Sequence, residues 1–303
     1  MHKKTTFSII LLVCIAALSG CTIPLEKFEY AGDKDPVTVP QGTHTKVILD
    51  FKVGVGTITL EVNPTANYLA YIENEVSIRE GSGTTLDDAE EVSYAEQNTE
   101  IMNIQFDSKD EGIEVDYGYD LTIKVCNNIT LQIDFQGSVS EISTTITDAT
   151  IAITSLDIQT STGNIEISLG NVQFSDSSPT ISSSTGNNDI TLSNLNYSTS
   201  TTWDITASTG TIEMDITDSI VPITPLSISM TYTFDVTGST GSISITADLH
   251  QDHGLKITTS VSTGDVTIPG GEKSYTSANY NAAIRNYEFD LSISTGDITF
   301  SSK

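Results

Sequence analysis

Two histidines and two carboxylates lie close together in one short stretch, and residues of these types could bind a transition metal. The stretch contains Asp248, His250, Asp252 and His253. Imidazole nitrogens and carboxylate oxygens are common zinc ligands, but a stable site needs a ligand set that closes around the ion. No further ligand at a suitable spacing is recognisable, and the stretch falls where a connecting loop is expected. The sequence therefore predicts no metal site and no cofactor.

A second candidate is a pair of aspartates, Asp265 and Asp297, each of which directly follows a glycine. Two facing carboxylates are the usual machinery of glycoside hydrolysis. Other copies of the same short motif carry Asn or Ser at this place, and Asp, Asn and Ser are all typical turn residues. We therefore expect turn residues here and no catalytic pair.

Residues 86–120 are rich in acidic side chains, most densely in Asp87-Asp88-Ala89-Glu90-Glu91. Clustered carboxylates could form a weak calcium site. The stretch lacks the ordered alternation of ligands that defines an EF-hand loop, so a solvated loop is expected.

The aromatic residues Trp203, Tyr275, Tyr280 and Tyr287 could stack on sugar rings, but packing in the core is the more common use of such side chains. Cys126 has no partner cysteine and no neighbouring histidine, and it stands beside Val125 and after Ile123, which favours an inert buried thiol. The sequence predicts no catalytic residue.

The N-terminus resembles an export signal that ends in a lipidation site. Two lysines precede an apolar run over 7–18, and Leu-Ser-Gly stands directly before Cys21. This pattern predicts a lipoprotein signal peptide over 1–20, lipidation of Cys21 and a short tether over 21–36. The alternative is a plain secretory signal with an incidental cysteine. The apolar run is too short for a membrane-spanning helix, which needs about 20 apolar residues.

The chain is strongly acidic, with 40 acidic and 13 basic residues and a formal net charge of −27. No lysine or arginine occurs between Val125 and Leu255. Nucleic-acid binding requires basic residues that neutralise phosphates, so this class of partner is excluded.

The element that must position all these residues is a repeat of the tripeptide Ser-Thr-Gly. The glycines of its copies are Gly163, Gly186, Gly210, Gly241, Gly264 and Gly296. The intervals of 23 to 32 residues indicate stacked units that bury their apolar sides against their neighbours. Glycine suits such a corner because it reaches positive φ at little steric cost.

Apolar residues alternate with polar residues on both sides of each corner, which is typical of strands with one buried face. Ile212, Ile243 and Ile298 each stand two residues after a corner glycine and are expected to form one continuous buried column. The sequence predicts an all-β fold, a single right-handed, irregular β-solenoid over residues 37–303 with about 23–32 residues per rung. Rungs are expected to be irregular over 37–135 and regular over 136–303.

The last copy, over 290–300, is a complete strand-turn-strand unit, and only Ser301, Ser302 and Lys303 follow it in the sequence. A solenoid end normally carries a polar cap. We therefore expect this rung to be an open edge through which the chain could self-associate.

The run Asp120-Leu-Thr-Ile-Lys-Val-Cys-Asn-Asn-Ile-Thr-Leu131, followed by the Ser-Thr-Gly-Asp/Asn-Ile strands, resembles the putative-adhesin family of surface proteins, also called the toastrack domain. The resemblance covers roughly residues 45–303, although family members usually have Val-Pro where this chain has Val125-Cys126. It implies a single-sheeted or right-handed β-helix without established chemistry.

These patterns together predict a cell-surface, adhesin-like binding or structural protein without catalytic activity. It would be anchored by lipid to the membrane on the extracytoplasmic face of the cell envelope, with an unknown surface protein or glycan as its partner. The alternatives are an envelope-stress signalling scaffold that docks other membrane proteins and an enzyme that acts on polysaccharides.

Overall fold

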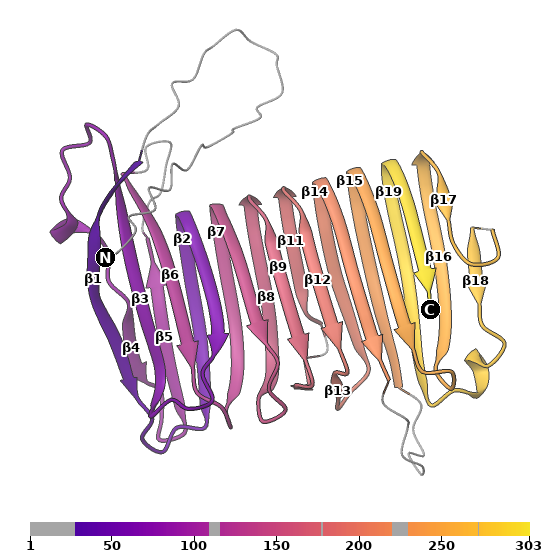
Figure 1. The fold of residues 1–303 in the computed structure, drawn as a ribbon, viewed down its shortest axis with the longest axis horizontal. Coiled ribbons are helices and arrows are strands. Elements are labelled where there is room, and N and C mark those ends of the chain that lie inside the picture. Colours follow the sequence, from indigo (N-terminus) through magenta and orange to yellow (C-terminus); the bar gives the residue numbers. More distant parts are fainter. Residues whose placement is uncertain (1–27, 109–115, 177, 220–229, 272) are drawn as a thin grey trace, which may run out of the picture.

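The computed structural model describes residues 28–108, 116–176, 178–219, 230–271 and 273–303. It is all-β (Figure 1). The first strands are β1 (Phe28–Pro40), β2 (Lys46–Val62), β3 (Tyr68–Arg79), β4 (Ser93–Glu96), β5 (Ile101–Asp107), β6 (Tyr117–Val125), β7 (Thr130–Ile146), β8 (Ala152–Thr162), β9 (Ile165–Gly170) and β10 (Gln173–Phe174). They are followed by β11 (Thr180–Thr185), β12 (Asn188–Ser193), β13 (Asn196–Tyr197), β14 (Thr201–Asp218), β15 (Met230–Leu249), β16 (Gly254–Thr263), β17 (Val266–Thr267), β18 (Ser274–Thr276) and β19 (Arg285–Ser302), and by the short 3₁₀ turns η1 (Leu86–Asp88) and η2 (Tyr280–Ala282).

Each repeat forms one rung, which consists of a first arm, a Ser-Thr-Gly corner and a second arm. The rungs lie side by side in a row (Figure 1). Some rungs consist of one long strand and others of two shorter strands, one for each arm. Neighbouring rungs pair in parallel, and their order is β5–β6, β2, β7, β8–β9, β11–β12, β14, β15, β19 and β16–β17. Antiparallel strands flank this row, since β3 pairs with β6 and β1 with β3 at one end, and β18 pairs with β16 at the other.

Two rungs do not follow the order of the chain. β2 lies between β5–β6 and β7, and β19 lies between β15 and β16. The expectation that residues 290–303 form an open edge is therefore wrong. Both sides of β19 are occupied, because the chain passes through β16 and β17 before it returns to fill the gap beside β15.

The N-terminal boundary also differs from the expectation. Residues 28–36, which the sequence assigns to a tether, belong to β1 and pair with β3. The signal segment 1–20 and Cys21 lie outside the described residues. Within the described chain, no helix has the length and hydrophobicity of a membrane-spanning segment.

The predicted buried column is confirmed. Ile212 pairs with Ile243 and Ile243 with Ile298, and each is at most 1% exposed. Inward side chains of both arms belong to one hydrophobic core. An aromatic stack runs through this core, in which Trp203 lies between Phe174 and Phe234.

The corners stack directly on one another. Their glycines have φ between +134° and +144°, as expected from the sequence. A Cβ on Gly241 would lie 1.7 Å from the carbonyl oxygen of Gly210, so no other residue fits without moving the backbone. In β7 the corner is formed by Ser140, which pairs with Gly56 on one side and lies against Gly163 on the other.

Candidate functional site

The two histidines of the stretch 248–253 point to different partners. His253 points into the protein and its Nδ1 lies 3.7 Å from Oδ2 of Asp218, whereas His250 pairs with Asp252 at 3.5 Å. The described residues contain no group of three or more His, Cys, Asp or Glu side chains that could hold a metal ion.

A buried polar cluster that the sequence did not reveal lies next to His253. Nη1 of Arg285 donates to Oδ2 of Asp218 at 2.8 Å, and the hydroxyl of Tyr287 donates to the same oxygen at 2.5 Å. Burial, reinforced by the charge of Asp218, raises the pKa of Tyr287. Asp218 continues the inward alternation of Met214 and Ile216, which is the signal that could have revealed it. Because these groups are enclosed in the core, the cluster joins β14 to β19 and is not a site open to substrate.

The remaining sequence candidates take structural positions. The backbone N–H of Asp265 donates to Oδ1 of Asp297 at 2.9 Å, so these residues link neighbouring corners as turn residues. Trp203 and Tyr287 are buried in the core and Tyr275 packs against it, while Tyr280 is half-buried. Cys126 is buried, and burial raises the pKa of its thiol.

The acidic stretch over 86–120 is only partly described, because residues 109–115 lie outside the described chain. Asp87 and Asp88 lie in η1 and are exposed, and Asp88 accepts a hydrogen bond from the hydroxyl of Thr85 at 2.7 Å. That the whole stretch is a solvated loop stays a prediction.

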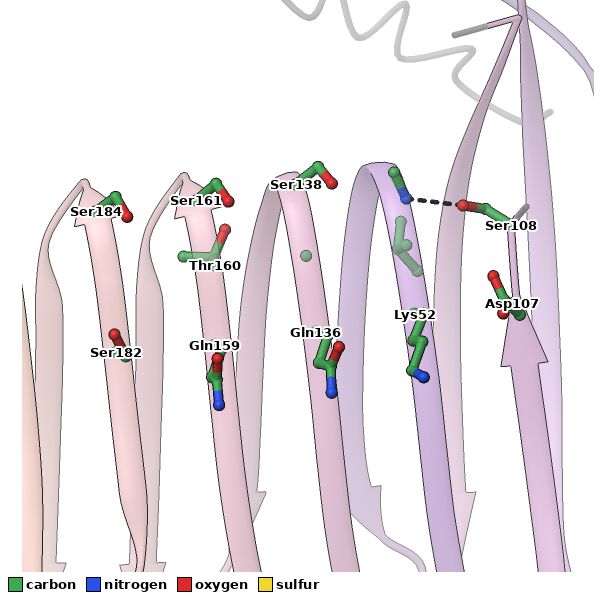
Figure 2. Close-up of a pocket in the computed structure, with 13 residues that line it drawn as sticks. Lys52, Asp107, Ser108, Gln136, Ser138, Gln159, Thr160, Ser161, Ser182 and Ser184 are labelled. Atoms are coloured by element: carbon green, nitrogen blue, oxygen red, sulfur yellow. Dashed lines mark hydrogen bonds between the residues drawn. The ribbon is translucent and has the colours of Figure 1, made fainter. Parts of the chain in front are cut away.

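A groove on the outer face of the first arms is the best candidate for a binding site (Figure 2). It has a volume of about 470 Å³ and crosses five rungs, from β5 through β2, β7 and β8 to β11. Its principal polar lining residues are Lys52, Asp107, Ser108, Gln136, Ser138, Gln159, Ser161, Ser182 and Ser184. The lining is therefore mostly uncharged and able to form hydrogen bonds.

The lining forms two rows because outward residues recur at the same place in every rung. The outer row contains Lys52, Gln136, Gln159 and Ser182, which are register partners in successive strands. Two residues further along, Ser138, Ser161 and Ser184 form a second row at the corner (Figure 2). At the outer-row position β2, β7 and β8 carry the longer side chains Lys52, Gln136 and Gln159, whereas this position is Thr or Ser in the rungs after β11.

Aspartates beneath the outer row orient its two glutamines. Nε2 of Gln136 donates to Oδ1 of Asp134 at 3.1 Å, and Nε2 of Gln159 donates to Oδ1 of Asp157 at 2.9 Å. A carboxylate accepts and does not donate, so the amide nitrogen must face it. In Figure 2 each amide nitrogen lies away from the corner and the amide oxygen lies nearer to it. The groove therefore presents two fixed hydrogen-bond acceptors.

The end of the groove at β5 carries charge. Lys52 and Asp107 are register partners in β2 and β5, and both are exposed. Ser108 is buried and lies nearer the corner than Lys52 and Asp107 (Figure 2). Its Oγ accepts the backbone N–H of Gly54 at 3.0 Å, which ties the wall of the groove to β2.

Comparisons with known proteins give similarity to solved structures. No model of a protein family matches the chain, and no curated protein matches it. A putative cell adhesion protein from Clostridium sporogenes matches at 13% identity over 89% of this chain and 99% of its own, with a TM-score of 0.39. A putative adhesin from Bacteroides fragilis matches at 12% identity over 88% of this chain and 95% of its own, with a TM-score of 0.33. A putative lipid binding protein from Parabacteroides distasonis matches at 12% identity over 88% of this chain and 96% of its own, with a TM-score of 0.24.

Proposed function

We propose that this chain is a non-catalytic, adhesin-like binding protein of the cell surface, and that the groove over β5, β2, β7, β8 and β11 is its recognition site. The observation that carries the proposal is the continuity of the groove across five rungs with a lining of hydrogen-bonding side chains. Such a surface suits an elongated polar ligand better than a small molecule, which usually binds in an enclosed and largely apolar pocket.

The lining also favours binding over catalysis. Among the described residues that line the groove there is no histidine, and Asp107 is the carboxylate they include. Nucleophilic catalysis by one of the serines would require a base within hydrogen-bond reach, and glycoside hydrolysis would require a facing pair of carboxylates. The lining supplies neither arrangement, so its serines serve as hydrogen-bonding groups.

We further propose that the architecture is an irregular, right-handed β-solenoid. Support comes from parallel registers that join every rung from β5–β6 to β16–β17 and from the corner glycines that stack through them. A rigid stack of this kind presents an extended surface, which is how repeat proteins commonly bind their partners.

Anchoring at Cys21 is part of the same proposal. Its support is the signal-like sequence that precedes Cys21. Replacement Cys21→Ser should move the protein from the membrane fraction to the soluble fraction of the cell envelope. Retention of Cys21→Ser in the membrane fraction would show that lipid on this residue is not the anchor.

The recognition site is tested by adhesion of the full chain. Beads that carry the chain are applied to immobilised cell-envelope material, and a Gln136→Ala, Gln159→Ala double variant is compared with Thr237→Ala. Thr237 is exposed at the outer-row position of β15, outside the groove, so it is a matched control. Adhesion should fall in the double variant and persist in the control. Equal adhesion of both variants would contradict the proposed site.

A further inference from the structure

We infer that the groove binds a neutral, extended polysaccharide that runs along the row of rungs, across the strands. The inference rests on the proposed function, because it names the class of ligand for the same site. Three features of the described groove support it: the orientation of its acceptors, their spacing and the charge around them.

The fixed acceptors require a ligand that donates hydrogen bonds. One N–H of each amide is donated to Asp134 or Asp157, and this contact turns the amide oxygens of Gln136 and Gln159 away from the aspartates, where the ligand can reach them. The exposed serines of the corner row can donate or accept. Sugar hydroxyls match both kinds of group, because each hydroxyl is at once a donor and an acceptor.

The spacing of the acceptors fits a polymer of sugar rings. Gln136 and Gln159 are register partners in adjacent strands, so equivalent groups recur about every 4.8 Å along the groove. A chain of pyranose rings in extended form advances by a similar length per ring and offers hydroxyls at each ring. A peptide strand advances about 3.3 Å per residue and turns alternate residues to opposite sides, so its donors do not keep this register.

The surrounding charge excludes a polyanion. Asp50, Asp134 and Asp157 are register partners directly beneath the outer row, and the whole chain carries a net charge of −27. Among the described lining residues Lys52 is the cation, and its register partner Asp107 offsets it. Uronic-acid polymers and nucleic acids would be repelled, whereas an uncharged glycan would not.

Asp134 and Asp157 act in this scheme as positioning residues, since they hold the glutamines and do not line the groove. Their role can be separated from a structural one by exchanging the partners. Asp134→Asn alone removes the group that fixes the amide, so Gln136 can turn over. In the double variant Asp134→Asn, Gln136→Glu, the amide at position 134 donates to the carboxylate at position 136. The second carboxylate oxygen at position 136 then faces the groove as an acceptor, as the amide oxygen of Gln136 does in the original chain.

The test is titration calorimetry of the full chain with cellohexaose, mannohexaose and dextran oligomers as neutral probes and oligogalacturonate as the anionic probe. We expect a neutral probe to bind and oligogalacturonate not to bind. The Gln136→Ala, Gln159→Ala double variant should weaken binding about tenfold, because two uncharged hydrogen bonds are lost. Thr237→Ala should leave the affinity unchanged. Asp134→Asn should weaken binding, and the swapped pair should recover it, while all four variants keep a cooperative melting transition.

Each outcome decides a different point. One outcome is adhesion to envelope material that depends on the groove and yet is inhibited by oligogalacturonate. Another is adhesion that depends on the groove although no neutral probe binds. Either result would overturn the proposed class of ligand and leave the proposed function standing. Neutral probes that bind the double variant as tightly as the original chain would overturn the groove as their site. If the folded, unaltered chain neither adheres to envelope material nor binds any probe, the proposed function itself would be overturned.

Discussion

Gly241 shows why the corner glycines are needed for the stack. Its φ is +140°, and a side chain would run into the carbonyl of Gly210 in the next rung. We expect Gly241→Ala to lower the stability by more than about 2 kcal/mol, because both the conformation and the contact are unfavourable.

The matched control for this substitution is Gly271→Ala. Gly271 also has positive φ, at +73°, but nothing lies within 4 Å of a Cβ placed on it. Thermal melting should show a small loss for Gly271→Ala and a large loss for Gly241→Ala. Equal losses would mean that backbone conformation alone, and not the close contact between corners, explains the requirement.

Asn188 occupies a place in the buried column that isoleucine fills in neighbouring rungs. It pairs with Ile165 on one side and Ile212 on the other and is fully buried. Nδ2 of Asn188 donates to the carbonyl oxygen of Thr206 at 2.9 Å, but in the described chain its Oδ1 has no hydrogen-bond partner. An unsatisfied buried acceptor is costly.

We therefore expect Asn188→Ile to raise the stability by about 1 kcal/mol, since an apolar side chain of similar size completes the column. Differential scanning calorimetry would measure the change, and the reciprocal Ile190→Asn should destabilise the protein. A lower melting temperature for Asn188→Ile would show that the Asn188 amide contributes more than the apolar contact it displaces.

Within the strands, one outward position carries a row of carboxylates. The residues at this position are register partners, and in order of rungs they are Gln105, Asp50, Asp134, Asp157, Thr180, Asp204, Asp235, Asp290 and Thr258. Burial, followed by the charges of Asp204 and Asp290, raises the pKa of Asp235. Like charges directly opposite one another destabilise a sheet.

The raised pKa of Asp235 determines how the stability of the protein changes with pH. A carboxylate whose pKa is raised in the folded state binds its proton more tightly there than in the unfolded chain, so stability falls as the pH rises through that pKa. Asp235→Asn should therefore raise the melting temperature at pH 7. The gain should shrink in high salt and vanish below the ordinary Asp pKa of 3.8.

Asp248→Asn is the control for this row, because Asp248 lies on the same strand but pairs with Thr217. It should change the melting temperature little at any pH. A gain for Asp235→Asn that is the same at pH 7 and pH 3 would show that repulsion between carboxylates is not the cause.

The sequence could predict those features that depend on residues close together in the chain. The alternation of apolar and polar residues predicted the inward face of Ile212 and its partners. The distance of each residue from its corner glycine predicted the register between rungs that share the Ser-Thr-Gly motif. The pairing of Asp218 with Arg285 was not predictable, because it joins residues 67 positions apart that no repeat relates. The groove was also missed, although Gln136 and Gln159 share one offset from their corners, because its hollow depends on which rungs become neighbours.

The order of the rungs is the largest difference between expectation and structure, and it has a consequence for folding. Sequence order predicts that β16 stacks on β15, but β19 separates them. β19 follows β16 and β18 in the sequence, so β16 and β18 can take their final places only when β19 has been made. Pairings between strands so far apart in sequence form slowly, because the loop between them must close first.

Removal of residues 285–303 tests this arrangement. If β19 were an outer rung, the truncated chain would keep all its other rungs and simply expose the preceding one. Because β19 pairs with both β15 and β16, we expect the truncated chain to lose β16, β17 and β18 from the stack while β2 to β14 remain folded. Hydrogen exchange would show this as fast exchange of the amides over 254–276 with protection retained at Ile165, Ile190 and Ile212. Protection of 254–276 in the truncated chain would mean that β16 can pair with β15 directly, and that β19 is not required to hold the end of the stack together.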